Sequence, residues 1–184
     1  ITIQYLGISD PCILPTSRFY FLKNWSRWIN RVLTFNSVKK AELELDIANE
    51  QAAEIVKMKE VAPERSDAIV KAATNYQANV DRLKNQLEAL RDTSQNPNVD
   101  KLMEKLADRS VKHQQLFDEL KKKFEDKPEL KQRFGEMQDK MNEAIIKIPE
   151  KFDSQEEFKE RMKRAIEARP DNLFRELRGM EMME

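Results

Sequence analysis

The strongest constraint on this chain is an apolar repeat whose steps alternate between three and four residues. Between Asn36 and Val61 the repeat runs through Val38, Ala41, Leu45, Ala48, Ala52 and Ile55. A second run extends from Ile69 to Leu90 with the same alternation of steps. Side chains spaced in this way line one side of an α-helix, and two such helices pack side by side at a shallow angle. The repeat therefore predicts long helices joined into hairpins.

Breaks in the pattern divide the chain into three parts. We predict a short extended N-terminal arm over residues 1–18, a long helical-hairpin bundle over 19–148 and short C-terminal helices over 149–184. The bundle is interrupted at prolines and polar turns, and short connections make consecutive helices antiparallel. The chain has only 3 glycines in 184 residues, and sheets joined by tight turns need more. The predicted fold class is all-α, an elongated antiparallel bundle with heptad packing.

An aromatic segment precedes the long helices. Six of its residues between Phe19 and Phe35 are aromatic, and they include both tryptophans of the chain. At helical spacing the apolar residues form one face, made of Phe21, Leu22, Trp25, Trp28, Ile29 and Val32. Lys23, Arg27 and Arg31 lie on the other side. The segment is therefore predicted to be a strongly amphipathic helix.

Two interpretations of this aromatic face remain open. In the first, which we take as the prediction, the face packs against one end of the bundle and the three cations face water, because a helix this short is marginal alone in water. In the second, the face lies in a membrane–water interface, where aromatic side chains opposite basic ones bind. Residues 1–36 carry a net charge of +3, which would favour an anionic surface.

Two polar residues, Ser110 and His113, interrupt the apolar stripe of the helix predicted over 99–125. A buried polar residue in such a stripe often fixes the register of neighbouring helices. A histidine can instead act as a pH-sensitive switch. No carboxylate lies four residues before or after His113 to tune its ring, so we predict a polar register layer.

The chain lacks the motifs of common catalytic and nucleotide-binding sites. It has one histidine and one cysteine, Cys12, and it contains neither a glycine-rich phosphate loop nor a His-Glu-x-x-His pattern. Four glutamates could line a carboxylate site between helices, but such residues more often form a solvated face: Glu42, Glu44, Glu50 and Glu54. We predict that the protein is not an enzyme and binds no metal or other cofactor. Balanced charges, 33 basic and 33 acidic, predict no nucleic-acid partner.

A set of residues near the N-terminus follows a recognisable pattern, namely Leu14, Pro15, Ser17, Tyr20, Leu22, Lys23, Thr34, Phe35, Lys40, Ala41 and Leu45. With these residues, about 8–125 of the chain resembles a DUF5667-type family, a domain of unknown function in exported bacterial and archaeal proteins. Arg18 and Ser37 stand where that family has proline, and Leu33 replaces its first phenylalanine of Phe-Thr-Phe. The resemblance implies a removed export signal and an extracytoplasmic, largely helical product. It implies no activity.

Three functions are consistent with these patterns. The first is a non-enzymatic extracytoplasmic structural or binding protein, such as a cell-surface or secreted scaffold that binds a protein partner or itself. The second is a membrane-interface module that uses the aromatic basic helix 19–35. The third is a helical-hairpin chaperone of the export compartment, which rests on analogy of architecture alone.

Overall fold

The computed structural model describes residues 1–90, 97–146 and 160, and in these ranges helices account for all regular secondary structure. The helices are α1 (Tyr20–Leu33), α2 (Ser37–Val61), α3 (Ser66–Glu88), α4 (Pro97–Lys123) and α5 (Pro128–Ile146). The all-α prediction is confirmed, and the five helices fall within residues 19–148, where the bundle was predicted. The helices predicted within 149–184 fall outside the described residues, except for Glu160.

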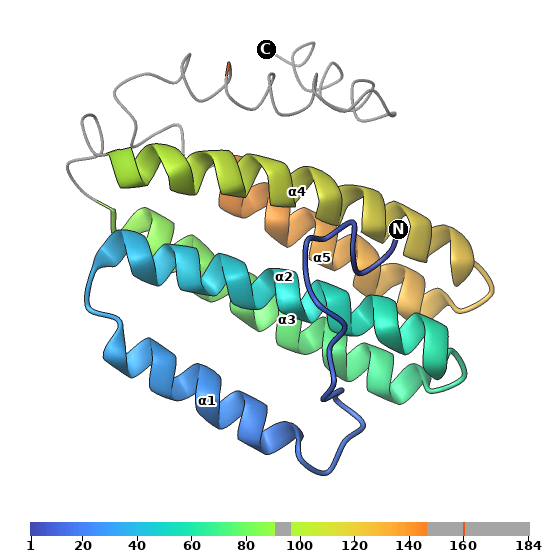
Figure 1. Ribbon diagram of the computed structural model, residues 1–184. Helices are drawn as coiled ribbons and strands as arrows, with labels where there is room; N and C mark the ends of the chain where they lie inside the picture. The colour runs from blue at the N-terminus through green and yellow to red at the C-terminus, as the bar shows by residue number, and fades with distance from the viewer. Residues whose placement is uncertain (91–96, 147–159, 161–184) are drawn as a thin grey trace.

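Helices α2 to α5 form a four-helix bundle made of two antiparallel hairpins (Figure 1). The hairpin of α2 and α3 packs against the hairpin of α4 and α5, so that α2 contacts α3 and α4, and α5 contacts the same two helices. Proline occupies the first helical position of both α4 and α5, where its missing N–H costs no hydrogen bond. The shorter α1 lies outside the bundle alongside α2.

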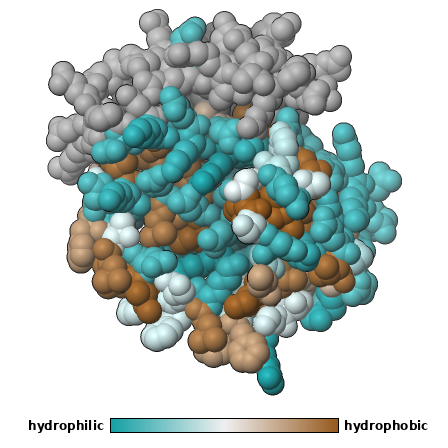
Figure 2. All heavy atoms as spheres, viewed as in Figure 1, coloured by the Kyte–Doolittle hydropathy of each residue, from teal (hydrophilic) through white to brown (hydrophobic). Residues whose placement is uncertain are grey.

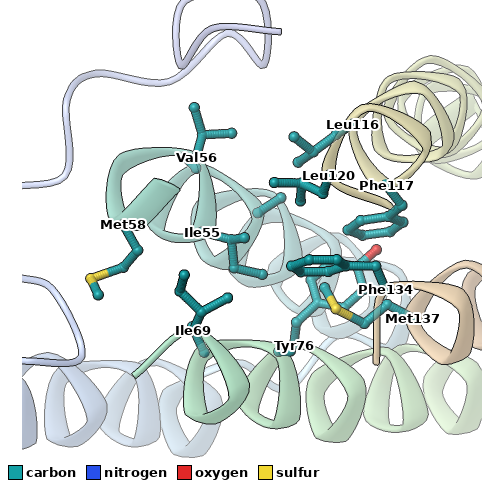
Figure 3. Close-up of a cluster of buried hydrophobic side chains, with 14 of the residues drawn as sticks. Ile55, Val56, Met58, Ile69, Tyr76, Leu116, Phe117, Leu120, Phe134 and Met137 are labelled. Atoms are coloured by element: carbon teal, nitrogen blue, oxygen red, sulfur yellow. The ribbon is translucent and has the colours of Figure 1, made fainter. Parts of the chain in front are cut away.

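The interior of the bundle is built from the predicted apolar stripes. The repeat from Val38 to Ile55 is buried at every position, and so is the run from Ile69 to Leu90. Figure 3 shows side chains from all four bundle helices meeting in the larger of two clusters, among them Ile55, Tyr76, Phe117, Leu120, Phe134 and Met137. A second cluster, with Leu45 and Leu83, fills the end of the bundle where α1 joins α2.

The N-terminal segment lies across α2 and α4 and contributes to the core. Ile3 and Leu6 are buried in the larger cluster. This segment is turned rather than extended over residues 3–7, which differs from the prediction. The N–H groups of Leu6 and Gly7 donate to the carbonyls of Ile3 and Gln4, and Gly7 has a φ of 72°, in the left-handed region that glycine adopts without strain. The turn directs Ile3 and Leu6 to the same side.

The sharp connection between α1 and α2 ends in a helix cap. Asn36 has an extended backbone, and its side-chain oxygen accepts a hydrogen bond from the Lys39 N–H at 3.1 Å. We expect Asn36→Ala to lower the free energy of unfolding by about 1 kcal/mol in urea denaturation, because that donor then loses its partner. Asn36→Asp keeps the cap and serves as the control. Equal stabilities of the two variants would show that the cap contributes nothing.

Candidate functional site

The orientation of α1 on the bundle is opposite to the predicted one. Its basic side faces α2, and Arg27 is only 5% exposed. The prediction that the apolar face packs against the bundle is therefore wrong. Ile29 is half-buried, and the other five residues of that face are exposed: Phe21, Leu22, Trp25, Trp28 and Val32. The prediction that Lys23, Arg27 and Arg31 face water is wrong for the same reason.

A buried carboxylate, Glu54 of α2, forms the centre of the contact with α1. One of its oxygens lies 2.7 Å from both Lys23 Nζ and Arg27 Nη2, and the other accepts a hydrogen bond from the Tyr20 hydroxyl at 2.7 Å. Arg27 also donates to Glu50 at 3.0 Å. Burial, followed by the charge of Glu54, raises the pKa of Tyr20 to about 12, so the hydroxyl keeps its proton and remains a donor.

A second ionic contact joins the end of α1 to α2 and α3. The Arg31 guanidinium donates to both carboxylate oxygens of Glu44, at 2.6 and 2.8 Å, and also to Asn79 Oδ1 at 2.7 Å. The Asn79 amide in turn donates to the backbone carbonyl of Glu44 at 2.6 Å. Two parallel bonds between a guanidinium and a carboxylate give a strong and directional contact. This contact holds the end of α1 against α2 and α3.

These contacts explain why the basic side of α1 turns inward. The apolar side chains of α2 pack on α3, α4 and the N-terminal segment, and they leave Glu44 and Glu54 on the side where α1 returns. A buried carboxylate costs several kcal/mol unless a cation and hydrogen bonds accompany it. Lys23, Arg27 and Arg31 recur every four residues, so all three reach the same side of α1. The apolar face must then point away from the bundle.

The outward side of α1 carries a group of exposed apolar side chains, which we call the aromatic face. It consists of exposed residues of α1 and its flanks: Phe19, Phe21, Leu22, Trp25, Trp28, Val32, Leu33 and Phe35. Trp25 and Trp28 are 60% and 57% exposed. In Figure 2 hydrophobic atoms gather along the lower left edge of the molecule, where α1 lies. Large apolar side chains that gather on an exposed surface mark an interaction site more often than scattered single ones do.

A separate polar layer crosses the core at the predicted residue His113. The ring is fully buried, with Nδ1 2.9 Å from the Tyr76 hydroxyl and Nε2 3.0 Å from Asn49 Oδ1. The Asn49 amide nitrogen donates to the carbonyl of Leu6 at 2.9 Å, so its oxygen faces the histidine. Nε2 must therefore carry the proton, and Nδ1 accepts from Tyr76. The layer connects α4 with α2, α3 and the N-terminal segment.

The protonation states in this polar layer are those of a structural contact. Burial, with smaller effects of Arg109 and Lys112, lowers the pKa of His113 to about 3, so the ring is neutral over the physiological range. Burial raises the pKa of Tyr76, which stays protonated as the donor. Ser110 is buried too, but its hydroxyl donates to the Ala107 carbonyl of its own helix at 3.0 Å. The cross-helix partners of His113 are thus Asn49 and Tyr76, and Ser110 is not among them.

The glutamates and other candidate groups are placed as follows. Glu44 and Glu54 are buried, contrary to the solvated face expected for them, while Glu42 and Glu50 remain partly exposed. Within residues 1–90, 97–146 and 160, no three His, Cys, Asp or Glu side chains gather where a metal ion could bind. None of the described helices has the combination of length and apolarity needed to cross a bilayer.

The chaperone alternative stays a prediction.

Sequence reasoning missed the ionic side of α1 and the asparagines of the polar contacts. One available signal was the charge of consecutive segments, since residues 11–41 contain no acidic residue and Glu42, Glu44, Glu50 and Glu54 follow at once. When a basic helix is followed by an acidic one in a hairpin, attraction between opposite charges favours contact of the two charged sides. No comparable signal distinguished Asn49 and Asn79 from surface asparagines.

Comparisons with known proteins give one match. The family model described as a domain of unknown function, DUF5667, matches residues 12–127, which is more than half of the chain. The match includes the whole of α1 to α4, and so contains the aromatic face, its ionic contacts and the side chains of the polar layer. Curated proteins and solved structures give no match. The chain therefore belongs to the DUF5667 family, as its N-terminal pattern had suggested.

Proposed function

We propose that this protein is a non-enzymatic binding module that attaches to a membrane surface through the aromatic face of α1. The observation that carries the proposal is the orientation of α1. Its cations form ion pairs with Glu44 and Glu54 of α2, and its aromatic face remains exposed. Covering a large apolar side chain is favourable by about 1.5–3 kcal/mol. A surface with two tryptophans and several phenylalanines therefore gains much from an apolar neighbour.

The shape and charge of this region favour lipid as that neighbour. The aromatic face is the convex side of a single helix, and lipid chains can conform to a convex ridge, whereas a protein partner would need a matching groove. Tryptophan and phenylalanine are the side chains that interfacial helices insert. Arg18 and Lys39 are exposed at the two ends of α1, and the absence of acidic residues from 11–41 removes repulsion by anionic lipid.

An extracytoplasmic setting, as a protein of the cell surface or export compartment, is the second part of the proposal. Its support is the family membership together with the exported character that the N-terminal pattern implies. The four-helix bundle would then act as the rigid body that the membrane-bound helix holds at the surface. A protease-protection experiment on cells that express the full-length protein, with any outer envelope permeabilised and the cytoplasmic membrane intact, checks this location. A protein digested only after the cytoplasmic membrane is ruptured would contradict it.

The two tryptophans provide a direct test of membrane binding, because both lie on the aromatic face. We expect emission typical of exposed tryptophan in buffer, and a blue shift when vesicles of phosphatidylcholine and phosphatidylglycerol are added. Phe21→Ala with Leu33→Ala leaves both tryptophans in place and removes two side chains that are 63% and 65% exposed. This double variant should weaken vesicle binding at least about tenfold, with an unchanged melting temperature.

The control is Val61→Ala, which truncates an exposed apolar residue at the far end of α2 and should bind as the wild type does. A tryptophan emission that is already blue-shifted in buffer, and that depends on protein concentration, would indicate self-association through the aromatic face. If sedimentation then shows a dimer that Phe21→Ala with Leu33→Ala dissociates, a second copy covers the face and the membrane proposal fails.

A further inference from the structure

A small cleft opens on the polar side of α1, where the end of this helix meets the first turns of α2 and the last turns of α3. Its volume is about 240 Å³. Pockets for drug-sized ligands start at about 300 Å³, so the cleft suits a small group rather than a nucleotide or an extended ligand. Its polar lining consists of Arg31, Lys40, Glu44, Arg82, Asn85 and Gln86.

The lining has an excess of positive charge and of hydrogen-bond donors. The one carboxylate, Glu44, is already bonded by both arms of the Arg31 guanidinium. Lys40 and Arg82 form no ion pair with any described carboxylate; Arg82 makes one hydrogen bond, to the carbonyl of Ala78 in its own helix. Asn85 and Gln86 add side-chain N–H groups beside these two cations. An anion with several acceptor oxygens would satisfy all four.

We propose that this cleft binds a phosphate group, either the headgroup phosphate of a membrane lipid or free phosphate. Lysine supplies a compact charge and arginine a planar fork, and the two together are the common side-chain partners of phosphate oxygens. The lipid form of this inference rests on the proposed membrane function. The binding of free phosphate does not.

The position of the cleft fits a lipid headgroup. A helix with its side chains is about 10–12 Å across, and an interfacial helix sinks about 5–10 Å into the boundary between headgroups and acyl chains. With Trp28 and Val32 inserted, the opposite side of α1 therefore lies at the level of the headgroups. Arg31 is on that side and lines the cleft.

The test compares two full-length double variants that lose the same charge. Lys40→Gln with Arg82→Gln removes the two unpaired cations of the cleft, and Lys71→Gln with Lys122→Gln removes two exposed cations elsewhere on α3 and α4. In sedimentation with phosphatidylcholine and phosphatidylglycerol vesicles, we expect the cleft variant to bind about 25-fold more weakly, about fivefold for each side chain. The control should bind as the wild type does, and a smaller gap should persist on phosphatidylcholine alone, because its headgroup also carries a phosphate.

Free phosphate is the second arm of the experiment. Inorganic phosphate is titrated into the isotope-labelled wild type at constant ionic strength against chloride, and the side-chain amide signals of Asn85 and Gln86 are followed by NMR. We expect both signals to shift in the wild type and in the control variant, and to stay in place in the cleft variant.

The outcomes separate this inference from the proposed function. Amide shifts without any vesicle binding would establish a free-phosphate site and end the membrane proposal. Vesicle binding by the wild type, with the cleft variant equal to its control and no amide shift, would overturn the phosphate site and leave the membrane proposal intact.

Discussion

Replacing Glu54 by leucine is expected to lower the free energy of unfolding by about 3–5 kcal/mol in urea denaturation followed by circular dichroism. The variant leaves the buried Arg27 and the partly buried Lys23 without their shared carboxylate, and the hydroxyl of Tyr20 loses its acceptor. Release of α1 into water would relieve the two cations. The same substitution should therefore also detach α1 and increase its cleavage by protease.

A double-mutant cycle tests whether the loss comes from the ion pair itself. Arg27→Met with Glu54→Leu places apolar side chains of similar size against each other, and we expect it to recover a large part of the loss caused by Glu54→Leu alone. Glu42→Leu is the matched control, because Glu42 pairs with Lys105 at the surface and should cost less than about 1 kcal/mol. Equal effects of Glu54→Leu and Glu42→Leu would contradict the ionic attachment of α1.

Acidification below about pH 6.5 is expected to destabilise the fold, and His113 by itself is sufficient to cause this loss. In the folded protein burial lowers the pKa of this histidine to about 3, whereas in the unfolded chain it takes its ordinary value of 6.5. Above pH 6.5 both states are neutral and the histidine makes no difference. Below it the unfolded chain binds a proton that the folded protein cannot, so the free energy of unfolding falls by up to about 1.4 kcal/mol per pH unit.

The range from pH 6.5 to 4.5 isolates the effect of His113. The pKa values of Glu119 and Glu136 are lowered from an ordinary 4.5 in the folded protein, so the stability that these carboxylates contribute is lost only below about pH 4.5. We expect a loss of about 2–3 kcal/mol across this range in urea denaturation. His113 is the only histidine, so His113→Gln should be less stable at neutral pH but flat from 6.5 to 4.5. A wild-type curve that is flat as well would show that His113 is accessible to protons in the folded protein.

The helices and their core sides could be predicted from sequence, because alternating steps of three and four residues leave few other ways to bury the apolar stripes. The orientation of α1 about its own axis could not be predicted. Its periodicity separates an apolar side from a basic side, but periodicity does not say which side faces the protein. That was decided by Glu44 and Glu54, whose burial depends on how the other sides of α2 are occupied. Side-chain pairs that are distant in sequence, such as Asn49 with His113, were equally invisible.

The burial of α2 on nearly all its sides has a consequence for which amino-acid substitutions the chain tolerates. Of the 25 residues of α2, 15 are buried, since partners cover it on almost every side, whereas α1 buries only Tyr20 and Arg27. Most substitutions in α2 disturb packing or an ionic contact, so this helix is expected to diverge slowly among related chains. The outer side of α1 carries no such burden for folding. Its residues are free to vary as far as folding is concerned, so aromatic character retained there in relatives would support the proposed binding role of this face.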